Sequence, residues 1–217
     1  MQPDTTGPWT PVAFSKDLPN RTVMPAQITA GPIALWRNGS GQAAASVDRC
    51  PHRGMRLSHG FVRGEALSCI YHGWSYAQAG HCLRIPAHPG LVPPETIRVA
   101  TYAVNERGGI IWIASGEPHG EPPLFEGLAP LRSLTANASI GAIEAATGKT
   151  ADAEGLLEFS HDLGTAFLLL CAQGQDSTLI HVLLETSADA GAGIAASRAM
   201  ERLRREAEKF QLEEVTP

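Results

Sequence analysis

Two short segments of the chain bring together side chains that bind transition metals. Residues 50–54 read Cys-Pro-His-Arg-Gly and residues 69–74 read Cys-Ile-Tyr-His-Gly-Trp, so each segment offers one thiol and one imidazole. Both groups are ligands for zinc and for iron. Two loops can therefore grip one metal site from opposite sides. The candidate ligands are Cys50, His52, Cys69 and His72.

Each segment also carries a glycine close to its histidine, Gly54 in the first and Gly73 in the second. Glycine has no Cβ, so the backbone can approach a metal site closely there. We expect the two loops to aim backbone amides at the ligand sulfurs.

Three interpretations fit the four candidate ligands. Zinc accepts two cysteines and two histidines, but its usual pattern is a cysteine pair followed by a histidine pair. A Rieske [2Fe-2S] cluster has two cysteines on one iron and two histidines on the other, which suits one of each from each loop. In the third interpretation the four residues are ordinary buried cysteines and loop histidines. The alternation of Cys and His favours the cluster.

The sequence around these ligands resembles the Rieske domain of ring-hydroxylating oxygenases and oxidative demethylases. Further landmarks are Ser-His-Gly at 58–60, Tyr76, Gly80 and Gly-Ile-Ile-Trp-Ile-Ala-Ser-Gly-Glu-Pro at 109–118. The resemblance covers about residues 10–118. It implies that the two cysteines hold the inner iron and the two histidines hold the outer, more exposed iron. The residues expected to surround the ligands are Arg53, Gly54, Gly73 and Trp74.

The positions next to the ligands predict a low reduction potential within the Rieske range. Respiratory-chain Rieske proteins carry an extra cysteine in each loop and a serine that donates to the cluster. In this sequence the residues that resemble the positions of those cysteines and that serine are Met55, Tyr71 and Trp74. Fewer donors to the sulfurs leave the negative charge of a reduced cluster less stabilised. A low potential suits an electron donor to oxygen chemistry.

The composition narrows the class of protein. The chain has 217 residues and a net charge of -5, which gives no general affinity for nucleic acid. Its longest apolar run, 166–172, is far shorter than the roughly 18 residues of a membrane span. The N-terminus has neither the basic flank nor the apolar stretch of a secretory signal. We expect a cytoplasmic protein that binds neither nucleic acid nor membrane.

The charge distribution predicts two domains. Residues 1–118 hold 10 basic and 7 acidic side chains, whereas residues 119–217 hold 7 basic and 15 acidic ones. The shift coincides with the Pro-rich stretch 116–123, and composition shifts at such stretches are typical of domain boundaries. We place a Rieske domain at 1–118 and a small second domain at 119–217.

The predicted fold class is α+β. The first domain reads as all-β, an antiparallel sandwich or small barrel with two cluster-binding loops. The second reads as a helix at 152–161, a hairpin of 165–172 and 178–185, and a final helix with one apolar face. Strands are expected in the first domain at 10–14, 32–37, 43–47, 66–71, 97–104 and 110–114. The apolar face of the final helix carries Ala196, Met200, Leu203, Ala207 and Phe210, and we expect it to pack against the hairpin.

The second domain lacks a complete iron site of the kind found in Rieske oxygenases. In that family a helix carries an acidic residue followed by two histidine ligands of a mononuclear iron. Glu158 and His161 match the first two places, but Ala166 stands at the third, and a methyl group cannot coordinate iron. The facial triad of such enzymes needs three protein ligands. We therefore expect no mononuclear Fe(II), and assign Glu158 a possible role in bridging to a cluster histidine.

The third iron ligand of the family, a carboxylate in the last helix, has no clear counterpart. It should fall near Arg204 if Gln211 is the equivalent of the family's glutamine, with Glu201 and Glu206 close by. The remaining histidines and cysteines have structural interpretations. His59, His81, His88 and His119 are expected in solvated turns, His181 in a buried strand, and Cys82 and Cys171 as small buried hydrophobic residues.

These features lead to one main hypothesis and two alternatives. The main hypothesis is a non-catalytic electron-transfer component that passes electrons from a flavin or ferredoxin reductase to a catalytic oxygenase subunit, within a trimer-based homo- or hetero-oligomer. The first alternative is a small terminal oxygenase or demethylase for an aromatic substrate, if His181 or another distant residue completes the iron site. The second is a free Rieske-type ferredoxin.

Overall fold

The computed structural model describes residues 6–162 and 164–215. The chain forms two compact units. Among the described residues, the first comprises 6–10, 15–106 and 111–122, and the second comprises 11–14, 107–110, 123–162 and 164–215. No helix in the described ranges is both long enough and apolar enough to cross a membrane.

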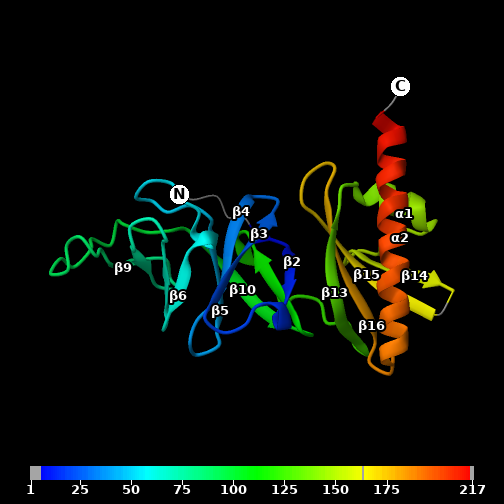
Figure 1. Cartoon of the computed structure of the whole chain (residues 1–217), viewed down its shortest axis with the longest axis horizontal. Coiled ribbons are helices and arrows are strands. Elements are labelled where there is room, and N and C mark those ends of the chain that lie inside the picture. Colours follow the sequence, from blue (N-terminus) through cyan, green and yellow to red (C-terminus); the bar gives the residue numbers. More distant parts are fainter. Residues whose placement is uncertain (1–5, 163, 216–217) are drawn as a thin grey trace. The chain divides into compact units, whose positions relative to one another are not determined.

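A six-stranded sheet forms the frame of the first unit (Figure 1). Its strand order is β2-β11-β10-β5-β4-β3, and the pairings β3–β4, β4–β5 and β5–β10 are antiparallel. Strand β11 is buried along its whole length, which is typical of a strand covered on both faces. The bounds are β2 Trp9–Phe14, β3 Thr22–Ile28, β4 Gly31–Arg37, β5 Ala43–Val47, β10 Thr101–Arg107 and β11 Ile110–Ala114.

A partly buried ion pair links strands β4 and β10 of this sheet. The guanidinium of Arg37 donates to both carboxylate oxygens of Glu106, at 2.6 and 2.9 Å. It also donates to the carbonyls of Leu18 and Gly41. The bidentate bond lowers the pKa of Glu106 below its ordinary value, so the carboxylate stays charged.

A smaller antiparallel sheet has the order β6-β7-β8-β9. The segment with Cys69 and His72 connects β7 to β8, and the segment with Cys50 and His52 lies between β5 and β6. A further two-residue pair, β1 with β12, is parallel. Because Ile97–Val99 pairs only locally with the β9 region, the strand expected at 97–104 begins at Thr101, and the one expected at 66–71 ends at Ser68. The bounds are β1 Thr6–Gly7, β6 Phe61–Arg63, β7 Ala66–Ser68, β8 Ser75–Tyr76, β9 Cys82–Arg84 and β12 Glu117–Pro118.

The second unit is a four-stranded antiparallel sheet with two helices on one face (Figure 1). The strand order is β13-β16-β15-β14. Alternate residues of the strands, such as Leu168 and Val182, form one core with the helices. The bounds are β13 Leu128–Ala136, α1 Ile140–Thr147, β14 Leu156–His161, β15 Gly164–Ala172, β16 Thr178–Glu185 and α2 Ala190–Val215.

The predicted hairpin and final helix are present, as β15, β16 and α2. On α2, Ala196, Met200, Leu203 and Ala207 are buried in the core with the sheet. Phe210, which was expected on the same face, is exposed. The stripe therefore packs within its own unit up to Ala207, and the prediction is wrong for Phe210.

The helix expected at 152–161 is wrong, because this segment contains strand β14. The Asp152 carboxylate accepts hydrogen bonds from the amides of Glu154 and Leu156, which closes a turn. Gly155 follows with φ +82°, in the left-handed region that favours glycine. The chain then pairs with β15, with Leu157 buried and Glu158 exposed.

Candidate metal centre

The two ligand loops share one backbone geometry. In the first, the Cys50 amide donates to the Met55 carbonyl and the Cys50 carbonyl accepts from the Gly54 amide, both at 2.8 Å. In the second, Cys69 makes the equivalent bonds with Trp74 and Gly73, at 2.9 and 3.0 Å. The two loops therefore form the same turn, with the glycine four residues after the cysteine, although their motifs differ: C-x-H in the first and C-x-x-H in the second.

Each turn requires its glycine. Gly54 has φ +73° and Gly73 has φ +70°, conformations that L side chains rarely adopt. A Cβ at Gly73 would also lie 3.0 Å from Pro86 Cγ. The glycine amides bond to cysteine carbonyls. The amides of Tyr71 and His72 hydrogen-bond to the Cys69 sulfur, which opposes the rise in the Cys69 pKa that burial causes. The donors to this sulfur are therefore the residues before the glycine.

The four candidate ligands form two pairs that differ in exposure. Cys50 and Cys69 are 2% and 1% exposed, and burial, together with the neighbouring Cys50 thiol, raises the pKa of Cys69 above its ordinary value. The rings of His52 and His72 are in edge contact, with centroids 4.6 Å apart. His52 is partly exposed and His72 is exposed. The thiol pair therefore lies inside and the imidazole pair at the surface.

The imidazole of His52 suits a metal ligand. Its Nδ1 is buried and has no hydrogen-bond partner in the described part of the chain. Burial, together with His72 and Arg53, lowers the pKa of His52 below its ordinary value. A neutral ring with an unshared lone pair is the form that binds metal.

Two pairs match two irons better than one zinc ion. A tetrahedral zinc site would need four ligands about 2.0–2.3 Å from one ion. A [2Fe-2S] cluster needs two ligands on each of two irons. The donor set therefore fits the cluster.

Aromatic rings cover the exposed pair. Trp74 stacks on His52, with an interplanar angle of 5° and centroids 4.3 Å apart, and Tyr71 lies against His72 at 3.9 Å. These contacts restrict the orientation of both imidazoles. Of the residues expected around the ligands, Trp74, Gly54, Gly73 and Arg53 all lie at the two loops, and Arg53 is exposed.

Tyr76 is a donor that the sequence analysis missed. Its hydroxyl lies 3.1 Å from the Cys50 sulfur, and the side chain is 2% exposed. Burial and the Cys50 sulfur raise the pKa of Tyr76 far above its ordinary value, so the hydroxyl keeps its proton and donates to a thiolate. In the sequence, the available indication of this role was that Tyr76 lies two residues after Trp74, close to the second ligand loop.

We expect the Tyr76→Phe variant to have a lower reduction potential than the wild type. A hydrogen bond to sulfur stabilises the more negative, reduced centre. A net hydrogen bond of about 1 kcal/mol corresponds to about 40 mV in a one-electron couple. A spectroelectrochemical titration measures the shift. Tyr102→Phe, at a partly buried tyrosine of β10, serves as the control, and equal potentials in all three proteins would contradict the prediction.

The remaining cysteines and histidines agree with their structural interpretations. Cys82 and Cys171 are buried, and burial raises the pKa of both thiols, that of Cys171 to about 11. His59, His81, His88 and His119 are exposed. His181 is fully buried on β16, where its Nδ1 lies 2.7 Å from the Ser133 hydroxyl. Burial lowers the pKa of His181 to about 4, so the ring is neutral.

The residues compared with the family's iron helix do not converge. Glu158 and His161 lie three positions apart on strand β14, so their side chains leave on opposite faces of the sheet. His161 shares the helix-covered face with Leu157 and Phe159, whereas Glu158 is exposed and forms an ion pair with Lys149 at 3.3 Å. Ala166 is fully buried in the core.

The last helix uses its polar residues for structural contacts. Arg204 forms ion pairs with Glu201 and Glu208, at 3.2 and 2.9 Å. Gln211 accepts a hydrogen bond from the Ser139 amide, at the start of α1, and donates to Asp176. The Arg204 pairs stabilise α2 itself, whereas the Gln211 bonds hold α2 to its neighbours.

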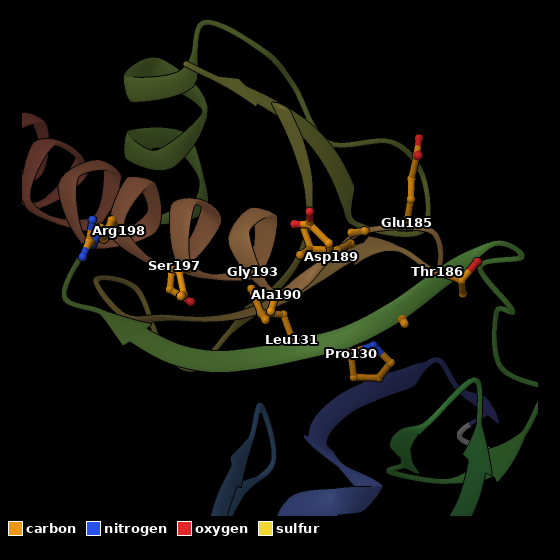
Figure 2. A pocket seen from close by; sticks show the side chains of 13 residues that line it. Pro130, Leu131, Glu185, Thr186, Asp189, Ala190, Gly193, Ser197 and Arg198 are labelled. Carbon is orange, nitrogen blue, oxygen red and sulfur yellow. The ribbon is translucent and has the colours of Figure 1, made fainter. Parts of the chain in front are cut away.

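A groove of about 580 Å³ lies in the second unit, between β13 and the start of α2 (Figure 2). Its walls include Leu131, Leu184 and Ile194. The Asp189 carboxylate at its edge accepts from the Ala192 amide and caps α2. The groove therefore combines an apolar wall with a carboxylate, that of Asp189, whose hydrogen bond stabilises the start of α2.

The fold and the two loops define a Rieske-type iron–sulfur domain, and comparison with known proteins agrees. Residues 8–103 match the family of Rieske [2Fe-2S] domains, so the chain contains such a domain, and this domain binds a [2Fe-2S] cluster. The chain is similar to the oxidoreductase NdmD of Pseudomonas putida, with 45% identity over 115 residues, which cover 52% of this chain and 20% of NdmD. It is also similar to the 4beta-methylsterol monooxygenase of Methylococcus capsulatus, with 40% identity over 114 residues, 51% of this chain and 30% of the relative.

Solved structures extend the likeness of fold into the second unit. The structure of apo dicamba monooxygenase matches with a TM-score of 0.73 at 18% identity. The match covers 94% of this chain and 85% of the dicamba monooxygenase chain. NdmA of Pseudomonas putida CBB5, a QL mutant with theobromine, has a TM-score of 0.70 at 20% identity and covers 94% and 80%. Similarity at this identity concerns the fold alone. The matched part of this chain spans less than a third of either curated relative.

Proposed function

We propose that the chain is a Rieske electron-transfer protein whose cluster is held by Cys50, Cys69, His52 and His72. The observation that carries this proposal is the division of the four side chains into a buried thiol pair and a surface imidazole pair. The cluster, when bound, supplies reversible one-electron transfer. The thiols hold it inside the domain, and the exposed imidazoles place its other edge where electrons can pass to a partner.

We further propose that the chain does not perform the oxygenase reaction itself but serves a catalytic subunit with a mononuclear iron. The positions of the histidines support this role. His161 shares the helix-covered face of the sheet with Leu157, whereas His181, between the core residues Ile180 and Val182 of β16, lies on the other face. The two histidines therefore lack the convergence that a facial triad needs.

The partners in this proposal are a catalytic oxygenase subunit and a flavin or ferredoxin reductase, in a trimer-based oligomer in the cytoplasm. Glu158, whose carboxylate is exposed, stays our candidate for a hydrogen bond to a cluster histidine. The domain division at 118 and 119 belongs to the same proposal. Two alternatives are a small terminal oxygenase acting on an aromatic substrate and a free ferredoxin. Iron and sulfide content and sedimentation distinguish them from the proposal.

The count of iron and acid-labile sulfide per chain, on anaerobically purified protein, tests the proposal. We expect two irons and two sulfides. Three irons with two sulfides would mean that a mononuclear site exists and that the chain is itself an oxygenase. A metal site without sulfide would contradict the cluster. Sedimentation of the cluster-loaded chain as a monomer, also in the presence of a catalytic oxygenase subunit, would favour the free ferredoxin.

A further inference from the structure

A pocket lined by three arginines lies beside the first ligand loop. The pocket has a volume of about 330 Å³. Cys50 and His52 contribute to its wall, and Arg49, Arg53 and Arg98 supply its charge. No Asp or Glu occurs among the described residues that line it. The first ligand loop therefore adjoins a concentrated positive charge.

The arginines of this pocket are available to a ligand. Arg49 and Arg53 are exposed, and neither has an ion pair with a carboxylate in the described ranges of the chain. The nearest acidic residue in the sequence, Asp48, is buried and accepts from the amide and hydroxyl of Ser58, at 2.7 and 2.6 Å. Arg98 donates one bond, to the Ala79 carbonyl at 3.0 Å. A free guanidinium presents a planar fork that matches a carboxylate.

The pocket is continuous with an apolar tip at the surface imidazoles. His52 lines the pocket and touches His72, which in turn touches Tyr71. Tyr71 and its neighbour Ile70 are 58% and 55% exposed, which is unusual for side chains of this size. Protein interfaces combine an apolar centre, rich in Tyr and Arg, with a polar rim. This surface has both parts, and it includes the two ligands nearest to solvent.

We propose that the arginine pocket and the Ile70–Tyr71 tip form the docking site for an acidic electron-transfer protein, whose carboxylates enter the pocket. The inference rests on the proposed electron-transfer function and names the chemistry of the partner. A small free anion would occupy the guanidinium groups and leave the apolar tip exposed. A protein carboxylate brings a surface that covers the tip, and charge complementarity speeds the encounter of the two proteins.

Equilibrium binding to an acidic redox protein tests the proposal. The full cluster-loaded chain is titrated with an oxidised plant-type ferredoxin at low ionic strength and again at about 0.3 M salt, where the Debye length falls below 10 Å. We expect binding that weakens with salt. The Arg49→Glu variant is expected to raise the Kd at low salt by about tenfold or more, because charge reversal removes an attraction and adds a repulsion.

Arg63→Glu provides the matched control, since it changes the charge of the same unit equally. Arg63 lies over the Phe61 ring, with the guanidinium carbon 4.7 Å from its centroid, and does not line the pocket. Its Kd should change less than about twofold. Equal weakening by both variants, or no ferredoxin binding to the wild type at low salt, would overturn the proposal. Binding of inorganic phosphate that depends on Arg49, without binding of ferredoxin, would overturn it too.

The spectrum of the cluster distinguishes a failure of the proposed electron-transfer function from a failure of the docking site alone. The reduced-state electron paramagnetic resonance spectrum is recorded for the wild type and each variant. A wild type without this signal contradicts the proposed function. A normal signal without Arg49-dependent binding contradicts the docking site alone. If Arg49→Glu does not fold, Arg49→Gln and Arg98→Gln test the same charges with smaller changes.

Discussion

We expect the His72→Ala variant to lose the reduced-state Rieske electron paramagnetic resonance spectrum and to retain about one-tenth or less of the wild-type cluster content. His72 is one of the two imidazoles proposed as iron ligands at the surface of the site. Its ring contacts that of His52, so the two imidazoles lie side by side. Loss of even an outer-sphere partner lowers metal affinity 10- to 100-fold, so loss of a ligand has at least that effect. Iron and sulfide content are measured on the same samples.

A matched substitution separates ligand loss from general damage. His59 is an exposed histidine of the same unit and lies outside the two ligand loops. The His59→Ala variant is expected to keep the full signal. A wild-type spectrum in His72→Ala would exclude His72 as a ligand, whatever the control shows.

The Gly80→Ala variant is expected to be destabilised by about 4 kcal/mol or more, a size reserved for backbone clashes and similar severe changes. A Cβ at Gly80 would lie 2.1 Å from the Val99 carbonyl oxygen. The Gly80 carbonyl accepts from the Val99 amide at 2.8 Å, so the two backbone segments cannot move apart without breaking this bond. Val99 belongs to the core that contains Cys50 and Cys69, so the cluster is expected to be lost with the fold.

Urea unfolding, followed by the visible absorption of the cluster, measures the effect. Gly64→Ala provides the control, because Gly64 also has a positive φ, +58°, but a Cβ there meets nothing within 4 Å. Its cost is therefore the conformational strain alone, about 1 kcal/mol. Similar midpoints for Gly80→Ala and Gly64→Ala would show that the backbone relaxes around the added methyl group.

The ligand loops could be predicted because their information is local. A thiol and an imidazole two or three residues apart lie near each other in almost any compact turn, and Gly54 and Gly73 mark the turns themselves. The final helix was predictable for a similar reason, since its apolar stripe repeats over several turns. Tyr76 was not recognised as a donor, because the distance from its hydroxyl to Cys50 depends on how β8 packs beside the first loop.

The segment around Glu158 shows where local information fails. Leu156, Leu157 and Phe159 are compatible with a helix or with a strand, and so short a segment does not discriminate between the two by its periodicity. The Asp152 turn and pairing with β15 decide the outcome. The consequence for the site is large, because residues three apart share a face on a helix but not on a strand.

The stacking of Trp74 on His52 gives the protein an optical reporter of its own metal content. The two rings are almost parallel, with centroids 4.3 Å apart, so an excited Trp74 indole lies in direct contact with a proposed iron ligand. Iron centres at such range accept the excitation energy, and the emission of this indole is then suppressed. Loss of metal should therefore appear as a rise in tryptophan fluorescence. The loading of the domain can be followed during purification, refolding or oxidation without any added dye.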